Sequence, residues 1–186
     1  MKQALLNIIF PKTCIFCRKQ GTWLCEDCFS LIEINPFQFC ICGKTKEKYK
    51  CEYCFSNLDG LFVCTRQDQK IVDKIINSYS KIKDLSIPLS LIILTHFLLL
   101  KKDTFDEFVI HPLPQDKKDI RRTGFNKTET MAEIISQKLK IPLIKNPEEI
   151  KNKKVLLFDI IYSDKMESLA KQLKPSQVFG LVIKKH

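Results

Sequence analysis

Glycine and histidine are scarce in this sequence. Its 186 residues include only five glycines and three histidines. Any phosphate-binding loop that needs glycine would have to draw on those five, because other residues rarely adopt positive φ. The sequence does not favour acid–base catalysis by histidine. His96 lies in a leucine-rich segment and is expected in the core, and His111 has no recognisable catalytic partner. The five glycines are Gly21, Gly43, Gly60, Gly124 and Gly180.

Long uninterrupted apolar runs are also missing. The longest apolar segment, residues 85–100, is interrupted by a proline and four polar residues: Ser86, Pro88, Ser90, Thr95 and His96. It falls short of the roughly 18 to 20 apolar residues that span a bilayer, which favours a buried helix. Residues 1–10 contain one lysine and meet Pro11 without a small-residue cleavage site, which is not typical of a signal peptide. We therefore expect a cytoplasmic protein with no membrane span.

Cysteine, by contrast, is abundant, with nine residues in the chain. Disulfides are rare in a reducing cytosol, so clustered cysteines there indicate metal ligands or redox groups. Eight of them form closely spaced pairs, in two consecutive sets with the spacing of short zinc ribbons. The ninth, Cys64, lies in a strand-like run and is expected to be a small buried hydrophobe. The two sets are Cys14, Cys17, Cys25 and Cys28, and Cys40, Cys42, Cys51 and Cys54.

Structural zinc is the metal that these sets favour. Thiolates are soft ligands, and four of them leave no open position at which a metal could activate water. The sequence therefore predicts two structural zinc ions, with an iron–sulfur cluster as an alternative. Only one residue separates Cys40 from Cys42, which narrows that turn. One zinc ion with four loose thiols is the alternative for the second set.

The chain is basic, with a formal net charge of +10. Eight thiolates and two Zn²⁺ ions would reduce this charge to about +6. Residues 1–64 hold 8 Lys and Arg against 6 Asp and Glu, whereas residues 65–186 hold 23 against 15. An anionic partner should therefore favour the C-terminal part. The alternative is a solvated, lysine-rich surface without a partner.

The periodicity changes after Asp59 and Gly60, where the cysteine pairs stop. We expect a zinc module over residues 1–59 and a larger domain over residues 60–186. The larger part alternates strand-like and helix-like segments, which predicts an α/β fold with a parallel sheet. Asn126, with Glu129 three residues on, indicates a helix start. We interpret residues 112–125 as a loop. Strands are expected near 61–66, 108–111, 155–159 and 178–183, and helices near 71–79, 88–100, 126–139 and 166–173.

Three segments together resemble one known family. Residues 5–17 read LLNIIFPKTCIFC, in which an apolar helix would run into a proline and the first cysteine pair. Residues 110–127 read IHPLPQDKKDIRRTGFNK, and residues 155–168 read VLLFDIIYSDKMES. These segments resemble the ComF family of competence-associated proteins. The resemblance implies a cysteine zinc module followed by a type I phosphoribosyltransferase-like parallel sheet with flanking helices.

The third segment departs from the family pattern. In such enzymes two consecutive acids bind the ribose hydroxyls, and a small glycine-containing loop wraps the 5′-phosphate with backbone N–H groups. Here Asp159 keeps one acid, Ile160 replaces the other, and residues 163–167 (SDKME) replace the loop. The resemblance implies a vestigial phosphoribosyl site at Asp159, Ser163 and Lys165, with weak or absent binding of phosphoribosyl pyrophosphate and Mg²⁺. Alternatively, Asp159 caps the following helix or binds a lysine.

The resemblance implies a role in natural transformation, in which the protein handles single-stranded DNA or its processing partners in the cytoplasm. A cluster of four cations near a helix start suits phosphate contacts. Phe125 either stacks on a base or anchors the loop. Two alternatives remain: a working phosphoribosyltransferase, against which the altered loop argues, and a zinc-ribbon adaptor that binds another protein. The cations are Lys117, Lys118, Arg121 and Arg122.

Overall fold

The computed structural model describes residues 11–42, 51, 54–100, 105 and 107–185. The expected apolar helix before Pro11 lies outside these residues. The strands are β1 (Gln38–Phe39), β2 (Gly60–Val63), β3 (Phe108–Pro112), β4 (Lys154–Ile161) and β5 (Gln177–Lys184). The α-helices are α2 (Glu26–Phe29), α3 (Lys70–Tyr79), α4 (Ser86–Leu100), α5 (Lys117–Thr123), α6 (Lys127–Leu139) and α7 (Asp164–Leu173). Two short 3-10 helices are η1 (Lys83–Leu85) and η2 (Pro147–Ile150).

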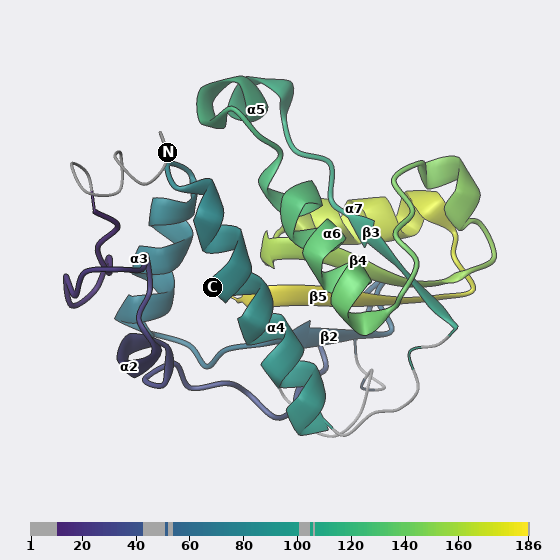
Figure 1. The fold of residues 1–186 in the computed structure, drawn as a ribbon. Helices are drawn as coiled ribbons and strands as arrows, with labels where there is room; N and C mark the ends of the chain where they lie inside the picture. The colour runs from purple at the N-terminus through teal and green to yellow at the C-terminus, as the bar shows by residue number, and fades with distance from the viewer. Residues whose placement is uncertain (1–10, 43–50, 52–53, 101–104, 106, 186) are drawn as a thin grey trace.

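One sheet organises the described chain (Figure 1). Its strand order is β1-β2-β5-β4-β3. The four strands from β2 to β3 are parallel, and the short β1 pairs antiparallel with β2 at one edge. Strands that alternate with helices along the chain pair in parallel because each connection crosses over one face of the sheet. The expectation of an α/β fold with a parallel sheet is therefore confirmed.

Helices cover both faces of this sheet. The apolar sides of α3, α4 and α6 pack on one face, around Phe62, Ile110 and Phe158. Helix α7 and η2 pack on the other face, around Leu61 and Leu157. Successive strand residues point to opposite faces, so fully apolar strands are expected where both faces are covered. Figure 1 shows α6 in front of the strands and α7 behind them.

A glycine in β5 lets α7 approach the sheet closely. A Cβ atom at Gly180 would lie 2.6 Å from Cδ1 of Leu61 and 2.7 Å from Sδ of Met166. Both distances are shorter than van der Waals contact, so any side chain here would force the Leu61 and Met166 side chains to move. Gly180 therefore leaves room for the Leu61 and Met166 side chains to pack between β5 and α7.

Helix α4 is apolar around its whole circumference. Pro88 lies in its first turn, where a missing N–H costs nothing. Seven of its residues are buried, including His96, whereas Ile87 and Leu98 are exposed, Leu98 by 78%. The segment Lys83–Leu100 is long and apolar enough to cross a membrane, and 44% of it is buried inside the fold. The expectation that the chain has no membrane span stays a prediction.

The segment after β3 differs from the expected loop. Residues 112–125 contain α5, which ends at Gly124 with φ of +78°, and Gly124 N–H bonds to the carbonyl of Ile120. The sequence KKDIRRT consists largely of good helix formers but has one apolar residue, so it shows no helical periodicity. The prediction of a loop here was wrong for that reason.

Helix α6 begins where the capping pair predicts. Oδ1 of Asn126 accepts the backbone N–H of Glu129 at 3.1 Å. Nδ2 of Asn126 donates to the Glu129 carboxylate, also at 3.1 Å. The first bond satisfies a backbone N–H that a helix start leaves open, and the second joins the two side chains. The predicted start of this helix is confirmed.

The first cysteine-bearing segment packs against the larger part of the chain. Cys14, Cys25 and Cys28 belong to the buried cluster that includes α3 and α4. Lys12 pairs with the Asp84 carboxylate at 2.7 Å, and the same carboxylate accepts the Trp23 indole N–H at 3.2 Å. The boundary between residues 1–59 and 60–186 falls immediately before β2, and the division into two domains stays a prediction.

Candidate metal centres and the cleft at the end of the sheet

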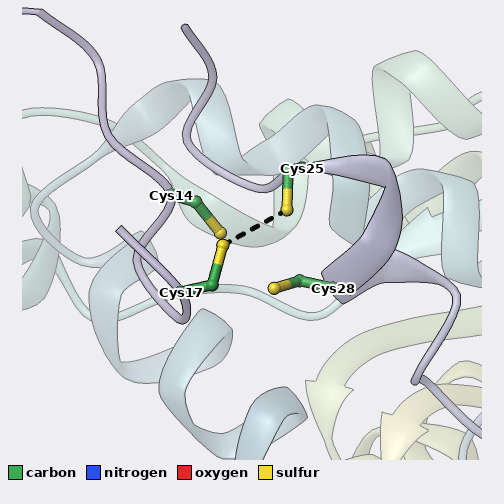
Figure 2. Close-up of side chains that lie close together, drawn as sticks. All are labelled: Cys14, Cys17, Cys25 and Cys28. Atoms are coloured by element: carbon green, nitrogen blue, oxygen red, sulfur yellow. Dashed lines mark hydrogen bonds between the residues drawn. The ribbon is translucent and has the colours of Figure 1, made fainter. Parts of the chain in front are cut away.

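The first cysteine set converges on one point. A turn after Cys14 is closed by the Arg18 N–H on the Cys14 carbonyl at 2.9 Å, and it brings Cys17 beside Cys14. Cys25 precedes α2 as its N-cap, and Cys28 lies inside that helix. All four Sγ atoms lie within 4.8 Å of one another, with 3.5 Å between those of Cys17 and Cys25. Figure 2 shows the four sulfur atoms pointing toward a common centre.

The second set assembles in the same way, although its first pair has the narrower spacing. The Sγ atoms of Cys40 and Cys54 are 3.2 Å apart, and those of Cys42 and Cys51 are 3.6 Å apart. All four lie within 4.8 Å of one another. The backbone N–H of Cys51 donates to Sγ of Cys40 at 3.3 Å, which stabilises a thiolate. The one-residue gap between Cys40 and Cys42 does not prevent convergence.

Both sets fit a tetrahedral zinc ion. With Zn–S bonds of about 2.3 Å, a tetrahedron places its sulfurs about 3.8 Å apart, close to the separations here. Burial acts to raise the pKa of Cys14, but hydrogen bonds from the backbone of Cys17, Cys25 and Phe16 lower it to about 6. Burial also acts to raise the pKa of Cys40, but backbone hydrogen bonds from Cys51 and Cys42 lower it to about 6. Each set could therefore bind a zinc ion.

The ninth cysteine takes no part in these sets. Cys64 is fully buried just after β2, and burial raises the pKa of its thiol well above the usual value. A neutral, buried thiol behaves as a small hydrophobe. The expectation for Cys64 is confirmed.

A cleft of about 210 Å³ lies at the carboxyl ends of β3 and β4. Ligands of open α/β sheets bind at this edge, where the strands end and helices begin. Its apolar lining includes Ile76, Leu113 and Ile160. Its polar lining consists of Gln115, Asp116, Asp119, Lys127, Thr128, Asp159 and Lys165. The fold thus brings two of the three predicted phosphoribosyl-site residues, Asp159 and Lys165, to one cavity.

Asp159 is the most perturbed carboxylate of the cleft. Burial raises its pKa to about 6, and the bond from the Ile160 N–H and the charges of Lys127 and Lys165 act in the opposite direction. Its Oδ1 accepts the Ile160 N–H at 2.7 Å. No cation forms an ion pair with Asp159 among the described residues, and Lys165 pairs instead with Asp116 at 3.2 Å. Asp159 therefore neither caps α7 nor binds a lysine directly.

The predicted vestigial loop is mostly helix. Ser163 is the N-cap residue, and α7 starts at Asp164. Met166 points into the core, whereas Glu167 accepts the Ser56 hydroxyl at 2.6 Å and the Asn57 N–H at 2.8 Å. Only Tyr162 and Ser163 separate β4 from α7.

These residues do not fit phosphoribosyl pyrophosphate. A 5′-phosphate needs a nest of backbone N–H groups, which a glycine-containing loop provides. The first turn of α7 instead carries Asp164 and Glu167, which would repel a phosphate. The Lys165 charge is balanced by Asp116, and the Ile160 side chain cannot bind a ribose hydroxyl.

The four predicted cations lie together on α5, which buries none of its residues. This helix projects away from the sheet at the top of Figure 1. Arg122 pairs with Asp119 at 2.9 Å, whereas Lys117, Lys118 and Arg121 form no ion pair within the described part of the chain. The cluster is therefore accessible and cationic.

Phe125 lies apart from this exposed surface. It is half-buried against Tyr79, with ring centroids 5.3 Å apart, and the Lys83 ammonium lies 5.7 Å from its ring centroid. The Tyr79 hydroxyl donates to the Lys127 carbonyl at 3.0 Å, which joins α3 to the start of α6. This packing supports the interpretation of Phe125 as an anchor for the segment.

The two buried histidines do not form a catalytic pair. His96 bonds through Nδ1 to the Asn35 carbonyl, and burial lowers its pKa to about 4. His111 bonds through Nδ1 to the Ile144 carbonyl at 2.8 Å, and burial lowers its pKa as well. His96 is in the core, as expected from the leucine-rich sequence.

Sequence reasoning missed five of the seven polar residues that line the cleft: Gln115, Asp116, Asp119, Lys127 and Thr128. Gln115 accepts the Lys127 N–H at 2.8 Å and so joins the end of β3 to the start of α6. The position of this segment, between a strand end and a capped helix start, was the available signal.

Comparison with protein families, with curated proteins and with solved structures gave no match for this chain. The fold and the cysteine geometry alone therefore define its class. It is an α/β protein with a four-stranded parallel sheet and two four-cysteine groups that could bind zinc.

Proposed function

We propose that this chain is a ComF-like protein of DNA uptake that binds single-stranded DNA with helix α5. Its phosphoribosyltransferase-like part serves as a scaffold and does not transfer phosphoribose. The resemblance of residues 110–127 and 155–168 to that family supports the role in natural transformation. The observation that carries the binding function is α5 itself, which presents four cations and buries none of its residues.

The exposure of α5 is the basis for this assignment. A seven-residue helix with one apolar residue gains little from packing, so its place in the fold is not explained by the core. Lys117, Lys118, Arg121 and Arg122 span less than two turns, and Asp119 is the only acid among them. Single-stranded DNA is bound chiefly through such cations on its phosphates.

Two alternatives compete with this proposal. Phosphoribosyl transfer is disfavoured because α7 begins two residues after β4 and carries Asp164 and Glu167 in its first turn. A protein adaptor would use the same cations on an acidic partner surface. DNA binding distinguishes the adaptor from the proposed function, because the adaptor does not need affinity for nucleic acid.

Fluorescence anisotropy with a labelled single-stranded oligonucleotide tests the proposal. Arg121→Ala with Arg122→Ala should weaken binding strongly. The control, Lys138→Ala with Lys171→Ala, removes the same charge near the C-terminal ends of α6 and α7, outside α5, and should change binding little. Equal effects of the two double variants, or no binding at about 50 mM salt, would favour the adaptor.

A further inference from the structure

One continuous segment forms both the cationic helix α5 and part of the wall of the cleft. Gln115 and Asp116 line the cleft and lead directly into α5, and Asp119 of that helix lines the cleft as well. A single DNA strand whose phosphates contact Lys117 or Lys118 would therefore pass the mouth of the cleft. This adjacency places the cavity within reach of a base of the bound strand.

The chemistry of the cleft disfavours an anionic ligand. Its lining carries three carboxylates, on Asp116, Asp119 and Asp159, and two ammonium groups, on Lys127 and Lys165. Lys165 is already paired with Asp116. A neutral group with several N–H donors suits this lining better than a phosphate does, because it places no negative charge beside the carboxylates.

The size of the cleft also limits its ligand. Its volume of about 210 Å³ is below the roughly 300–1,000 Å³ typical of sites for drug-sized molecules. Ile76, Leu113, Pro114 and Ile160 provide apolar contacts. Such walls with a few polar groups suit a flat, single-ring or two-ring heterocycle, which an unstacked nucleobase is.

We propose that the cleft accepts one unstacked guanine of the bound strand, whose N1–H and N2–H donate to the Asp159 carboxylate. The Ile160 N–H on Oδ1 fixes the orientation of that carboxylate, and the remaining lone pairs can accept further bonds. Among the four DNA bases, only guanine has N–H donors on two adjacent nitrogens of its Watson–Crick edge. The Lys127 ammonium supplies a donor for the acceptors O6 or N7.

The other bases match this carboxylate less well. Thymine has a single N–H between two carbonyl oxygens, which an ionised Asp159 would repel. Adenine and cytosine each offer one amino group next to a ring nitrogen acceptor. The inference rests on the proposed function, because the strand is brought to the cleft by α5.

The test compares two labelled oligonucleotides, an oligothymidylate and the same oligomer with one central guanine, bound to the full chain at pH 7.5. The guanine oligomer should bind about tenfold more tightly to the wild-type protein. Asp159→Asn should abolish this preference, so that the variant binds the two oligonucleotides with equal affinity. The control Glu148→Gln, an exposed carboxylate in η2 that does not line the cleft, should keep the preference.

Equal affinity of the wild-type protein for the two oligonucleotides would overturn the inference without any variant. A guanine preference that persists in Asp159→Asn would overturn it too. An unfolding curve of that variant confirms that it is folded.

Free 2′-deoxyguanosine separates the inference from the proposed function. Saturation-transfer NMR should show binding to the wild-type protein and none to Asp159→Asn, with thymidine as the control nucleoside. If the protein binds deoxyguanosine but no oligonucleotide, the proposed function fails, and only the guanine site in the cleft stands. If it binds oligonucleotides without base preference and no deoxyguanosine, the inference fails and the proposed function stands.

Discussion

Glu167, in the first turn of α7, accepts the backbone N–H of Asn57 at 2.8 Å. Asn57 lies three residues after Cys54, the last member of the second cysteine group. The start of α7 is where the resemblance to phosphoribosyltransferases would place a phosphate-binding loop. In this chain a glutamate stands there, and it holds the segment that leads from the second cysteine group into β2.

The Glu167 contact should contribute measurably to stability. Its two carboxylate oxygens accept one bond from the Ser56 hydroxyl and one from the Asn57 N–H, and bonds to a charged group are stronger than neutral ones. We expect Glu167→Ala to lower the free energy of unfolding by about 1–2 kcal/mol. Urea unfolding measures this value. Asp164→Ala, an exposed acid of the same turn, is the control, and an equal loss in both variants would contradict the assigned role.

Metal content tests the two cysteine groups. Because both sets of sulfurs converge, the purified protein should contain about two zinc ions per chain, and Cys28→Ser should lose one of them. Cys64→Ser should keep both, since Cys64 lies outside the two sets. Elemental analysis measures the content. A chain without zinc, or one with iron and visible absorbance, would refute the prediction.

Removal of the metal should unfold the cysteine segments. Four thiolates held within 4.8 Å repel one another without a cation, so binding energy at such sites is largely folding energy. Because Cys14, Cys25 and Cys28 belong to the main buried cluster, a chelator should also lower the melting temperature of residues 60–185, which contain the four parallel strands. A melting temperature that a chelator leaves unchanged would show that the first metal centre does not support the core.

Asp159 should destabilise the protein at neutral pH. Burial raises its pKa from 3.8 to about 6, so between these values the folded state binds more protons than the unfolded state. Stability therefore falls as pH rises through this window. Asp159→Asn should raise the free energy of unfolding at pH 7 by about 1–3 kcal/mol, and the gain should vanish near pH 4.

Urea unfolding of the wild-type protein and Asp159→Asn at pH 4 and pH 7 measures this difference. A loss of stability in the variant at pH 7 would indicate a structural role for the carboxylate. A higher free energy of unfolding in the variant at pH 7 is expected if Asp159 serves binding and lowers stability.

Several elements were predictable because their sequence carries a local signal. The apolar face of α3, the capping pair of Asn126 and Glu129, and the apolar runs of β4 and β5 each follow from spacing alone. The cysteine groups were predictable for the same reason, since pairs two or three residues apart turn the backbone toward one ion. Each of these features depends on residues that are close in sequence, so a short stretch of sequence is enough to predict it.

The remaining features depend on tertiary contacts or lack a periodic signal. Helix α5 has no apolar face, so its pattern does not distinguish it from a loop. The cleft joins Ile76 of α3, Gln115 after β3 and Lys165 of α7, which are far apart in sequence. The bond between Glu167 and Asn57 spans 110 positions and has no local signature.

The salt dependence of single-stranded DNA binding tests the central claim most directly. Log affinity should fall linearly with log salt concentration, with a slope of about −0.7 for each phosphate neutralised. Arg121→Ala with Arg122→Ala should make the slope shallower by up to about 1.4, because two cations are lost, whereas Lys138→Ala with Lys171→Ala should leave it unchanged. An unaltered slope in the arginine variant would contradict the claim that α5 binds DNA.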